Sequence, residues 1–232
     1  MIDTAMILAA GRGERMRPLT DAIPKPLVEV AGRSLLDRAI DRLQRYGVRN
    51  VVINVHHLAE QIVDHVGPSR ARIVREDRLL DTGGGVRNAL PLLGNGPFFV
   101  LNGDGLWTDG PTPMLKRLEA AWDPKCMEAL LLLHPTDRAI GREASERGDY
   151  FLDDDSGTAR HRGDASRAPY MFASVSVCDS RLFRCSPEQP FSLVKLWHRA
   201  QAAGRLHGLV HDGQWFHIGT PEALAEAERV LR

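Results

Sequence analysis

The 232-residue sequence lacks several features that mark particular classes of protein. Its 3 cysteines, Cys126, Cys178 and Cys185, do not have the spacing of metal ligands, so we expect free thiols in a reducing compartment rather than a disulfide framework. The 30 lysines and arginines balance the 30 aspartates and glutamates, which leaves no excess charge for a nucleic acid. No apolar run approaches the length of a membrane span, and residues 1–10 have no basic region typical of a signal peptide. We therefore expect a cytoplasmic protein that binds neither membrane nor nucleic acid.

The amino-acid composition is that of a globular domain. Apolar residues make up 43% of the chain and charged residues 26%, both ordinary values. Apolar strand-like runs alternate with segments whose apolar residues recur at helical spacing, which is typical of an α/β fold with a parallel-rich sheet covered by helices. No repeat or linker divides the chain. We expect a single domain over residues 1–232 and interpret the polar stretch 138–167 as a lid or acceptor loop.

Hydrophobic periodicity and end signals predict the individual elements. The segments expected as strands are 5–9, 51–55, 72–74, 98–101, 128–133, 169–177, 206–210 and 214–218, with a hairpin near 150–160. The segments expected as helices are 35–43, 58–65, 86–93, 192–203 and 223–231. Gly47 and the pair at 67–68 are stop signals, and Thr220 is expected to cap the last helix.

The most distinctive segment combines glycine with fixed positive charge directly after the first apolar strand. It reads Leu8-Ala9-Ala10-Gly11-Arg12-Gly13-Glu14-Arg15 and is followed by Pro24-Lys25-Pro26. Glycines let backbone N–H groups approach a phosphate closely, and Arg15 and Lys25 supply cations. A simple tight turn is the structural alternative. The segment is not a Walker A loop, because no G-K-[ST] follows, and the absent third glycine disfavours a Rossmann dehydrogenase.

Two further segments point to the same chemistry. Asn102-Gly103-Asp104 follows a strand, where a carboxylate faces the ligand crevice of an open α/β sheet and suits Mg²⁺; a turn aspartate is the alternative. Thr82-Gly83-Gly84-Gly85 precedes a predicted helix and would let the backbone read a flat ring at close range; a flexible turn is the alternative. Glu76 follows a strand and is a candidate polar contact near the nucleotide.

Taken together, the L-x-A-G-x-G-x-R loop, P-K-P, T-G-G-G, N-G-D and a late G-T resemble the sugar-1-phosphate nucleotidyltransferases over nearly the whole chain. The resemblance implies a three-layer Rossmann-like fold with a mixed, mostly parallel sheet, and transfer of a nucleotidyl group from a nucleoside triphosphate to a sugar 1-phosphate with release of pyrophosphate. It implies Arg15, Lys25 and Asp104 as catalytic residues. The nucleotide-binding residues that it implies are Leu8, Ala9, Ala10, Gly11, Arg12, Gly13, Thr82, Gly83, Gly84, Asn102 and Gly103.

The resemblance also bears on the metal, and here the sequence departs from the family. Asp104 is expected to hold the catalytic ion, Mg²⁺. The family usually has W-x-D-[IV]-G-T for its second ligand, whereas this chain has Trp215-Phe216-His217-Ile218-Gly219-Thr220. An imidazole favours Mn²⁺ over Mg²⁺. His217 therefore binds the metal directly, binds it through water, or only shapes the pocket, and a core histidine is the structural alternative.

The sequence constrains the identity of the acceptor less than it constrains the reaction. The chain is most similar to short bacterial members that join N-acetylmuramic acid 1-phosphate to UTP in cell-wall recycling, and we expect no carboxyl-terminal acyltransferase domain. Arg142, Arg147 and Asp149 in the polar stretch and Lys195 on a helix are candidate contacts to the acceptor sugar. The alternatives are thymidylyl, cytidylyl or guanylyl transfer to another sugar phosphate or to phosphocholine, or a non-catalytic nucleotide-sugar binding protein. We expect a monomer.

Overall fold

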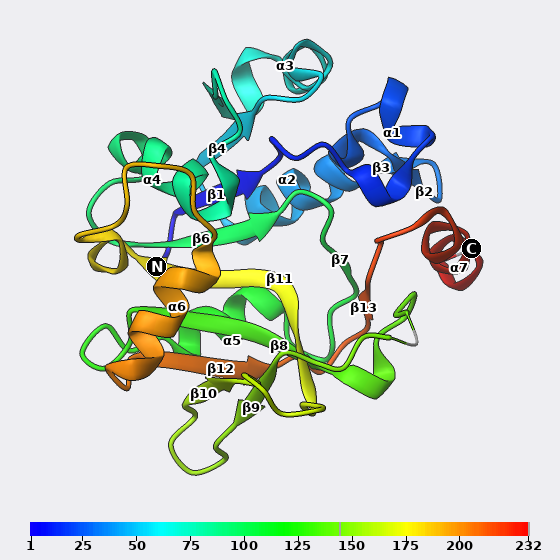
Figure 1. Cartoon of the computed structure of the whole chain (residues 1–232). Coiled ribbons are helices and arrows are strands. Elements are labelled where there is room, and N and C mark those ends of the chain that lie inside the picture. The colour runs from blue at the N-terminus through cyan, green and yellow to red at the C-terminus, as the bar shows by residue number, and fades with distance from the viewer. Residues whose placement is uncertain (144, 232) are drawn as a thin grey trace.

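One central sheet carries most of the strands in the computed structural model, which describes residues 1–143 and 145–231 (Figure 1). The strands of this sheet are β1 (Thr4–Leu8), β4 (Asn50–Val55), β5 (Arg72–Arg75), β6 (Pro97–Asn102), β8 (Ala129–Pro135), β9 (Tyr150–Leu152), β10 (Ala159–His161), β11 (Tyr170–Asp179) and β12 (Leu206–Val210). Two small pairs stand apart from it: β2 (Glu29–Val30) with β3 (Arg33–Ser34), and β7 (Leu106–Trp107) with β13 (Trp215–Phe216).

The sheet is mixed, as expected, and its strand order places the motifs at one edge. The order is β10-β9-β11-β6-β1-β4-β5, and β8 pairs with both β11 and β12. The strands β6, β1, β4 and β5 are parallel to one another, so their carboxyl ends meet at the same edge, where open α/β sheets bind ligands. β11 is antiparallel to both β6 and β8 and joins the two halves of the sheet. The Gly-rich loop and Asn102 therefore lie on neighbouring strand ends.

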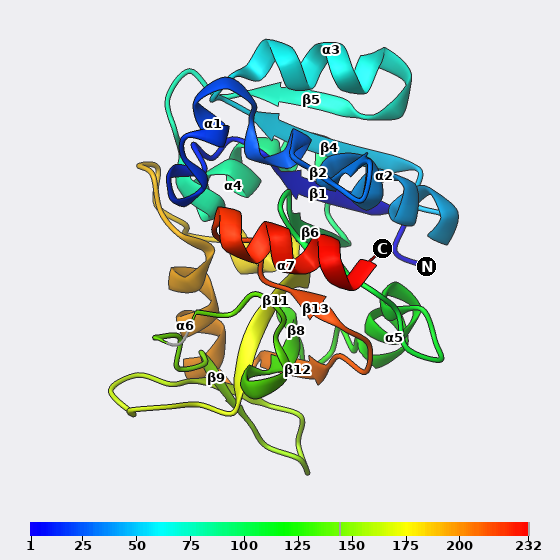
Figure 2. The ribbon, with the colours of Figure 1, turned by 90° about the vertical axis from the view of Figure 1, so that its right-hand side faces the viewer.

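Helices cover both faces of the sheet, which confirms the three-layer α/β prediction. They are α1 (Leu19–Ala22), α2 (Leu35–Tyr46), α3 (Ala59–Arg70), α4 (Asp81–Leu93), α5 (Met114–Ala121), α6 (Leu193–Ala202) and α7 (Pro221–Leu231). Short 3₁₀ turns occur at Glu14–Met16, Lys25–Leu27, Thr136–Arg138 and Ser180–Phe183. Figure 2, turned from the first view, shows α7 in front of the sheet and α3 beside β5.

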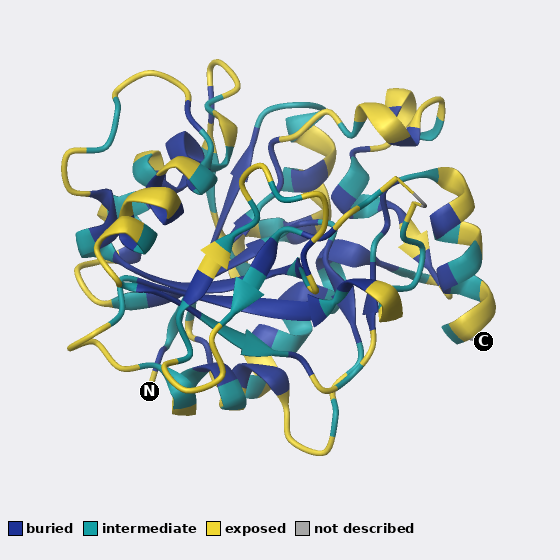
Figure 3. Cartoon of the chain, turned by 60° about the horizontal axis from the view of Figure 1, so that its bottom comes forward, coloured by how far each residue is buried: buried dark blue, intermediate teal, exposed yellow. Residues whose placement is uncertain are grey.

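Alternation along the buried strands divides the core between the two faces. Ala5 and Ile7 of β1 belong to the cluster that includes the apolar residues of α2, α3 and α5. Met6, between them, belongs to the cluster that includes α4 and α6. Successive strand residues point to opposite faces, so an apolar run such as 5–8 fits a strand buried on both sides. Figure 3 shows the strands buried and the outer helix faces exposed.

Several end signals act as the sequence predicted. Gly47, with a φ of 107°, directly follows the end of α2, as expected of a stop signal. The start of this helix is capped by the Ser34 hydroxyl, which accepts from the backbone N–H of Asp37 and was not predicted. The Thr220 hydroxyl accepts from the backbone N–H of Ala223 at 3.3 Å and caps α7. The predicted hairpin near 150–160 is the antiparallel pair β9 and β10.

Three details of the expected elements are wrong or incomplete. α4 begins at Asp81 rather than at residue 86, so the three glycines lie inside the helix and not before it. The helix expected over 58–65 breaks at Gly67 as predicted, and a short helical turn that was not expected follows and ends at Arg70. The sequence analysis did not predict α1, α5, β2, β3 or β7, although the strand expected at 214–218 contains β13. Within residues 1–143 and 145–231, every helix is too short or too polar to cross a membrane.

Candidate active site

The Gly-rich loop leaves β1 and turns back over the end of the sheet through Gly13. Gly13 has a φ of 63°, and a Cβ at this position would lie 3.0 Å from Cγ2 of Thr20 and 3.1 Å from Cβ of Lys25. The Thr20 hydroxyl donates to the Gly13 carbonyl at 2.9 Å. Glycine is therefore required here by both backbone conformation and packing. A Cβ at Gly11 would meet nothing within 4 Å, so that backbone is open.

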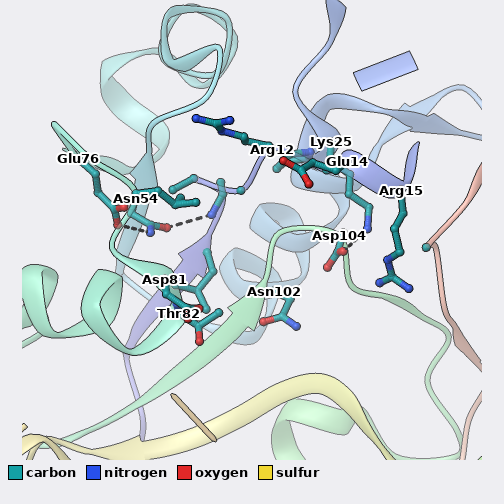
Figure 4. A pocket seen from close by; sticks show the side chains of 18 residues that line it. Arg12, Glu14, Arg15, Lys25, Asn54, Glu76, Asp81, Thr82, Asn102 and Asp104 are labelled. Atoms are coloured by element: carbon teal, nitrogen blue, oxygen red, sulfur yellow. Dashed lines mark hydrogen bonds and ion pairs between the residues drawn. The ribbon is translucent and has the colours of Figure 1, made fainter. Parts of the chain in front are cut away.

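This loop forms one wall of a cavity of about 650 Å³ (Figure 4), a volume within the usual range for small-molecule sites. The residues that line it are Leu8, Ala9, Ala10, Gly11, Arg12, Gly13, Glu14, Arg15, Lys25, Pro26, Asn54, Glu76, Leu79, Asp81, Thr82, Asn102, Asp104 and Gly219. Most of the predicted nucleotide-binding residues are in this set. The structure thus brings together segments from residue 8 to residue 219.

Lys25 and Asp104 form an ion pair within this cavity. The Lys25 side chain is 12% exposed and that of Asp104 is 33% exposed. Gly103 lies beneath them: its N–H donates to the Leu8 carbonyl at 2.8 Å, and a Cβ there would lie 2.6 Å from that oxygen. Gly103 is absent from the residues that line either cavity. Its place in the structure lets β6 and β1 stay paired while Asp104 leaves the sheet.

Asn54 and Glu76 form a buried polar pair at the other end of the cavity, drawn with dashed lines in Figure 4. The Asn54 side-chain oxygen accepts from the Ala9 N–H at 3.0 Å, and its amide donates to Glu76 at 2.7 Å. The second oxygen of Glu76 accepts from the Leu80 N–H at 3.0 Å. These bonds tie the Gly-rich loop to the segment after β5. The sequence analysis missed Asn54, although an amide in the middle of an apolar strand was the available signal.

The glycines of α4 pack against protein. The N–H groups of Gly83 and Gly84 donate to the Phe191 carbonyl at 2.9 and 3.1 Å. A Cβ on Gly83 would lie 2.3 Å from the Phe191 ring. Thr82 lines the larger cavity, whereas Gly83 and Gly84 are absent from its lining. The expected position of these glycines before the helix is therefore wrong: they lie inside α4 and let it approach the segment before α6.

A second cavity of about 260 Å³ adjoins the first. Its lining residues are Arg15, Asn102, Asp104, Glu146, Asp149, Met171, Phe172, Ser174, Trp215, Phe216, His217 and Ile218. Arg15, Asn102 and Asp104 line both cavities. Asp149 accepts from the Phe172 N–H at 2.9 Å, which directs its carboxylate. Carboxylates beside aromatic rings suit a polar ligand with apolar faces, such as a sugar.

Two carboxylates of the 142–146 segment contact the basic side chains of this cavity. Glu143 lies 3.5 Å from Arg15, and Glu146 lies 3.0 Å from Nε2 of His217. Burial lowers the pKa of His217, and Arg15 adds to this effect while the charge of Glu146 opposes it. The sequence analysis did not single out Glu143 or Glu146, because nothing in an acidic loop shows which carboxylates face inward.

Two of the acceptor candidates lie elsewhere. Arg147 is exposed, and its carbonyl accepts from the Ala168 N–H. Lys195 is exposed on α6. Both are absent from the lining of either cavity in the described part of the chain. Arg142 donates to the carbonyls of Glu143 and Glu146, so it shapes the loop. Of the predicted acceptor residues, the structure places Asp149 in the smaller cavity.

The carboxylates at and beside the junction of the cavities suit a hard divalent cation, whereas the His217 imidazole favours Mn²⁺ over Mg²⁺. Residues 1–143 and 145–231 contain no group of three His, Cys, Asp or Glu side chains close enough to bind one ion. Mg²⁺ is commonly held by one or two carboxylates together with substrate phosphates and water, so a complete protein cage is not required. Asp104 and Glu146 supply carboxylate oxygens in the same cavity, and His217 supplies a nitrogen. This donor set matches an ion that arrives with a phosphorylated ligand.

Comparison with known proteins gives consistent results. The profile of the MobA-like NTP transferase domain matches residues 5–138. The chain is 40% identical to N-acetylmuramate alpha-1-phosphate uridylyltransferase of Caulobacter vibrioides, over 98% of this chain and 96% of the relative. It is 33% identical to the protein of the same name from Neisseria meningitidis, over 97% and 96%.

Solved structures show the same fold at low identity. A UDP-glucose pyrophosphorylase complexed with UDP-glucose superposes with a TM-score of 0.82 at 17% identity, covering 100% of this chain and 98% of that one. HddC from Yersinia pseudotuberculosis complexed with GMP-PN gives a TM-score of 0.77 at 21% identity, with 100% of both chains covered.

Proposed function

The chain belongs to the family of MobA-like NTP transferase domains, and from that premise we propose that it transfers uridylyl from UTP to N-acetylmuramate α-1-phosphate. The products are the UDP-sugar and pyrophosphate. One observation carries the proposal: two cavities of different character meet at Arg15, Asn102 and Asp104. The names of the two full-length relatives supply the substrates.

The larger cavity is suited to the nucleotide. The open backbone at Gly11 gives a triphosphate access to N–H groups, and Arg15 and Lys25 offset its charge. Asn54 and Glu76 line the far end of the larger cavity, where a base would lie. Hydrogen bonds already fix the orientations of their side chains. Side chains that are already held in place lose little conformational entropy when a ligand binds.

The smaller cavity is suited to the acceptor, whose phosphate would lie toward Arg15 and Asp104. A phosphate oxygen of the acceptor attacks the α-phosphorus of UTP, the bond to the bridging oxygen breaks, and pyrophosphate leaves with that electron pair. No covalent enzyme intermediate is needed, so the chemistry depends on alignment and charge stabilisation. Lys25 offsets charge at the α-phosphate, and Arg15 stabilises the departing pyrophosphate. Asp149 accepts hydrogen bonds from sugar hydroxyls.

A divalent cation, when bound, offsets phosphate charge and makes the α-phosphorus more electrophilic. Asp104 would hold it, as Mg²⁺ or, because of the imidazole nitrogen of His217, as Mn²⁺. Before catalysis Asp104 must exchange its contact with Lys25, and Arg15 its contact with Glu143, for contacts to substrate.

We also propose that the chain acts as a monomeric, single-domain enzyme in the cytoplasm, in the recycling of cell-wall sugars. The continuous strand β11 supports the single domain, because it pairs with the strands of both halves. The segment 138–167 then belongs to the acceptor side through Glu146 and Asp149.

Pyrophosphate release tests the proposal. Purified protein is given N-acetylmuramate α-1-phosphate or N-acetylglucosamine α-1-phosphate with UTP, dTTP, CTP or GTP, in Mg²⁺ or Mn²⁺. We expect the highest kcat/KM with UTP and the N-acetylmuramate ester. A higher kcat/KM with another nucleotide or acceptor would reassign the substrates, and no release with any pair would contradict the reaction itself.

A further inference from the structure

Ser174 lies in an irregular stretch of β11, where the register of the pairing with β8 shifts between Phe172 and Ser176. The φ of Ser174 is 63°, in the left-handed region that residues with a Cβ rarely adopt. Such a conformation costs free energy and persists only where the surrounding structure imposes it. Irregularities of this kind redirect side chains and are frequent beside active sites. The backbone at Ser174 is therefore held in a costly form that sets the direction of its side chain.

The hydroxyl of Ser174 is buried and unpaired. The residue is only 8% exposed, and it lines the smaller cavity. Its Oγ has no hydrogen-bond partner within residues 1–143 and 145–231, yet it is not one of the unpaired side-chain atoms that are sealed from solvent. A hydroxyl provides one donor and two acceptor sites, and a buried one that stays unpaired is costly. The accessible part of this hydroxyl therefore opens into the smaller cavity.

Ser174 also packs against the turn that carries Asp104. A Cβ on Gly105 would lie 3.0 Å from Cβ of Ser174 and 3.2 Å from the Asn102 carbonyl oxygen, so glycine leaves the space that the serine occupies. The Gly105 N–H donates to the Asn102 carbonyl at 3.0 Å and closes the turn. Ser174 is thus beside the junction of the two cavities, and it lines the smaller cavity and not the larger one.

The other polar groups of the smaller cavity show what a free hydroxyl would add there. Carboxylates, which only accept hydrogen bonds when they are ionised, line this cavity at Asp104, Glu146 and Asp149. The phosphate oxygens of a sugar 1-phosphate also need donors. Arg15 and Asn102 can donate, but both line the larger cavity as well. Ser174 adds a neutral donor that belongs to the smaller cavity.

We propose that Ser174 is a contact residue for the acceptor: its hydroxyl donates a hydrogen bond to the sugar 1-phosphate in the smaller cavity, and the strained stretch of β11 directs it there. The inference rests on the proposed function, because it requires a sugar 1-phosphate in that cavity. It gives Ser174 a part in binding the acceptor and none in binding the nucleotide.

The test measures the Kd of N-acetylmuramate α-1-phosphate by isothermal titration calorimetry. The enzyme is loaded with Mg²⁺ and α,β-imido-UTP, an analogue that cannot release pyrophosphate. Ser174→Ala removes the hydroxyl and keeps the Cβ. We expect it to raise the Kd of the sugar phosphate about tenfold, the effect of losing one hydrogen bond, and to leave the Kd of the nucleotide analogue unchanged. A native Kd for the sugar phosphate in Ser174→Ala would overturn the proposal.

Ser176→Ala is the matched control for the loss of a buried hydroxyl from the same strand. Ser176 is 0% exposed, and in the part of the chain that the structure describes it is absent from the lining of both cavities. We expect the native Kd for the sugar phosphate in this variant. An equal rise of that Kd in Ser176→Ala and in Ser174→Ala would mean that the strand, and not the contact, is responsible, and would overturn the proposal.

Ser174→Gly separates a contact with the acceptor from a structural role. Glycine adopts the left-handed conformation without steric cost, so this variant should have a higher Tm than the native protein. Its Kd for the sugar phosphate should nevertheless rise as it does in Ser174→Ala. Stability and affinity then change in opposite directions, which a serine with a structural role alone would not produce. A native Kd in Ser174→Gly, or a raised Kd accompanied by a lower Tm, would overturn the contact role.

The outcomes distinguish this inference from the proposed function. A native enzyme that binds the sugar phosphate but releases no pyrophosphate with UTP would overturn the proposed reaction and leave the role of Ser174 standing. A native enzyme that releases pyrophosphate, with an unchanged Kd for the acceptor in Ser174→Ala, would overturn the role of Ser174 and leave the reaction standing. A native enzyme that binds neither N-acetylmuramate α-1-phosphate nor N-acetylglucosamine α-1-phosphate would overturn both.

Discussion

The two cavities differ in how they are built. The larger one lies at the carboxyl ends of parallel strands, and part of its wall is backbone: the open Gly11, the left-handed Gly13 and the Ala9 N–H that is bonded to Asn54. The smaller one is lined by residues of β11 and β13 together with Glu146 and Asp149, and Glu146 contacts His217 within it. The nucleotide side therefore has a preformed backbone wall together with the Lys25–Asp104 ion pair, while the acceptor side is lined by charged and aromatic side chains.

This difference matches the chemistry of each substrate. A triphosphate is the same in every nucleotidyl transfer, so fixed N–H groups and cations can bind it. An acceptor sugar is distinguished by the positions of its hydroxyls and substituents, which only directed side chains can read. Substitutions on the two sides should consequently have separable effects on turnover, on nucleotide binding and on acceptor binding.

The largest effect is expected from loss of the cations at the junction. Arg15→Ala or Lys25→Ala should lower kcat by about 10²- to 10³-fold, because each removes a prepositioned group that stabilises developing charge. Pyrophosphate release measures the loss. Arg17→Ala is the neighbouring control, since Arg17 is 56% exposed and pairs with Asp21. A variant of Arg15 or Lys25 with the native rate would remove that residue from the mechanism.

A second pair of variants separates a glycine that packs from a glycine that faces the ligand. Gly83→Ala should lower the free energy of unfolding by about 1–3 kcal/mol, because its Cβ would overlap the Phe191 ring. Gly11→Ala should change it by less than about 0.5 kcal/mol, because nothing lies within 4 Å, yet should raise KM for UTP. Urea denaturation and steady-state kinetics measure both. A destabilised Gly11→Ala protein together with an undestabilised Gly83→Ala protein would contradict the roles assigned to these two glycines.

Asp149→Asn tests the acceptor side alone. Loss of the charge should weaken hydrogen bonds to sugar hydroxyls and raise KM for the acceptor about tenfold, while KM for UTP stays the same. Asp153→Asn is a matched control, because Asp153 is exposed and bonds locally to Ser156. An equal rise in the KM for the acceptor and in the KM for UTP would show that the role of Asp149 is not confined to the acceptor.

The smallest effect concerns strain in β11. Ser174 lines the smaller cavity with a φ of 63°, at the register shift between Phe172 and Ser176. Ser174→Gly should raise the free energy of unfolding by up to about 1 kcal/mol, because glycine adopts this conformation without steric cost. Thermal denaturation measures the change, with Ser156→Gly in an exposed turn for comparison. A less stable Ser174→Gly protein would mean that the serine side chain contributes more than its backbone costs.

The difference between the two cavities also explains which parts of the site could be predicted from the sequence. The phosphate loop and Asp104 were predictable because the relevant residues are adjacent in the chain and follow apolar strands whose carboxyl ends must meet. The alternating strand and helix patterns predicted a sheet covered by helices, and the resemblance implied three layers and a mixed sheet, as the structure has. Which of these residues contact substrate stays a prediction.

The acceptor side could not be predicted in this way, because its contacts join distant positions. Glu146 meets His217 only after β13 returns beside β7, and Asn54 meets Glu76 across two strands. The glycines of α4 show the limit most clearly: a T-G-G-G pattern does not reveal whether a ligand or Phe191 will occupy the space that a Cβ would fill. Arg147 and Lys195 were candidates by charge alone, and both are exposed.

The most direct test of the account is a crystal structure of the enzyme with its reaction product, the UDP-linked acceptor sugar. The account predicts the uridine in the larger cavity beside Asn54 and Glu76, the diphosphate at Arg15 and Asp104, and the sugar in the smaller cavity with a hydroxyl on Asp149. A sugar bound outside the smaller cavity, or a uridine in it, would contradict the division of the site between the two cavities.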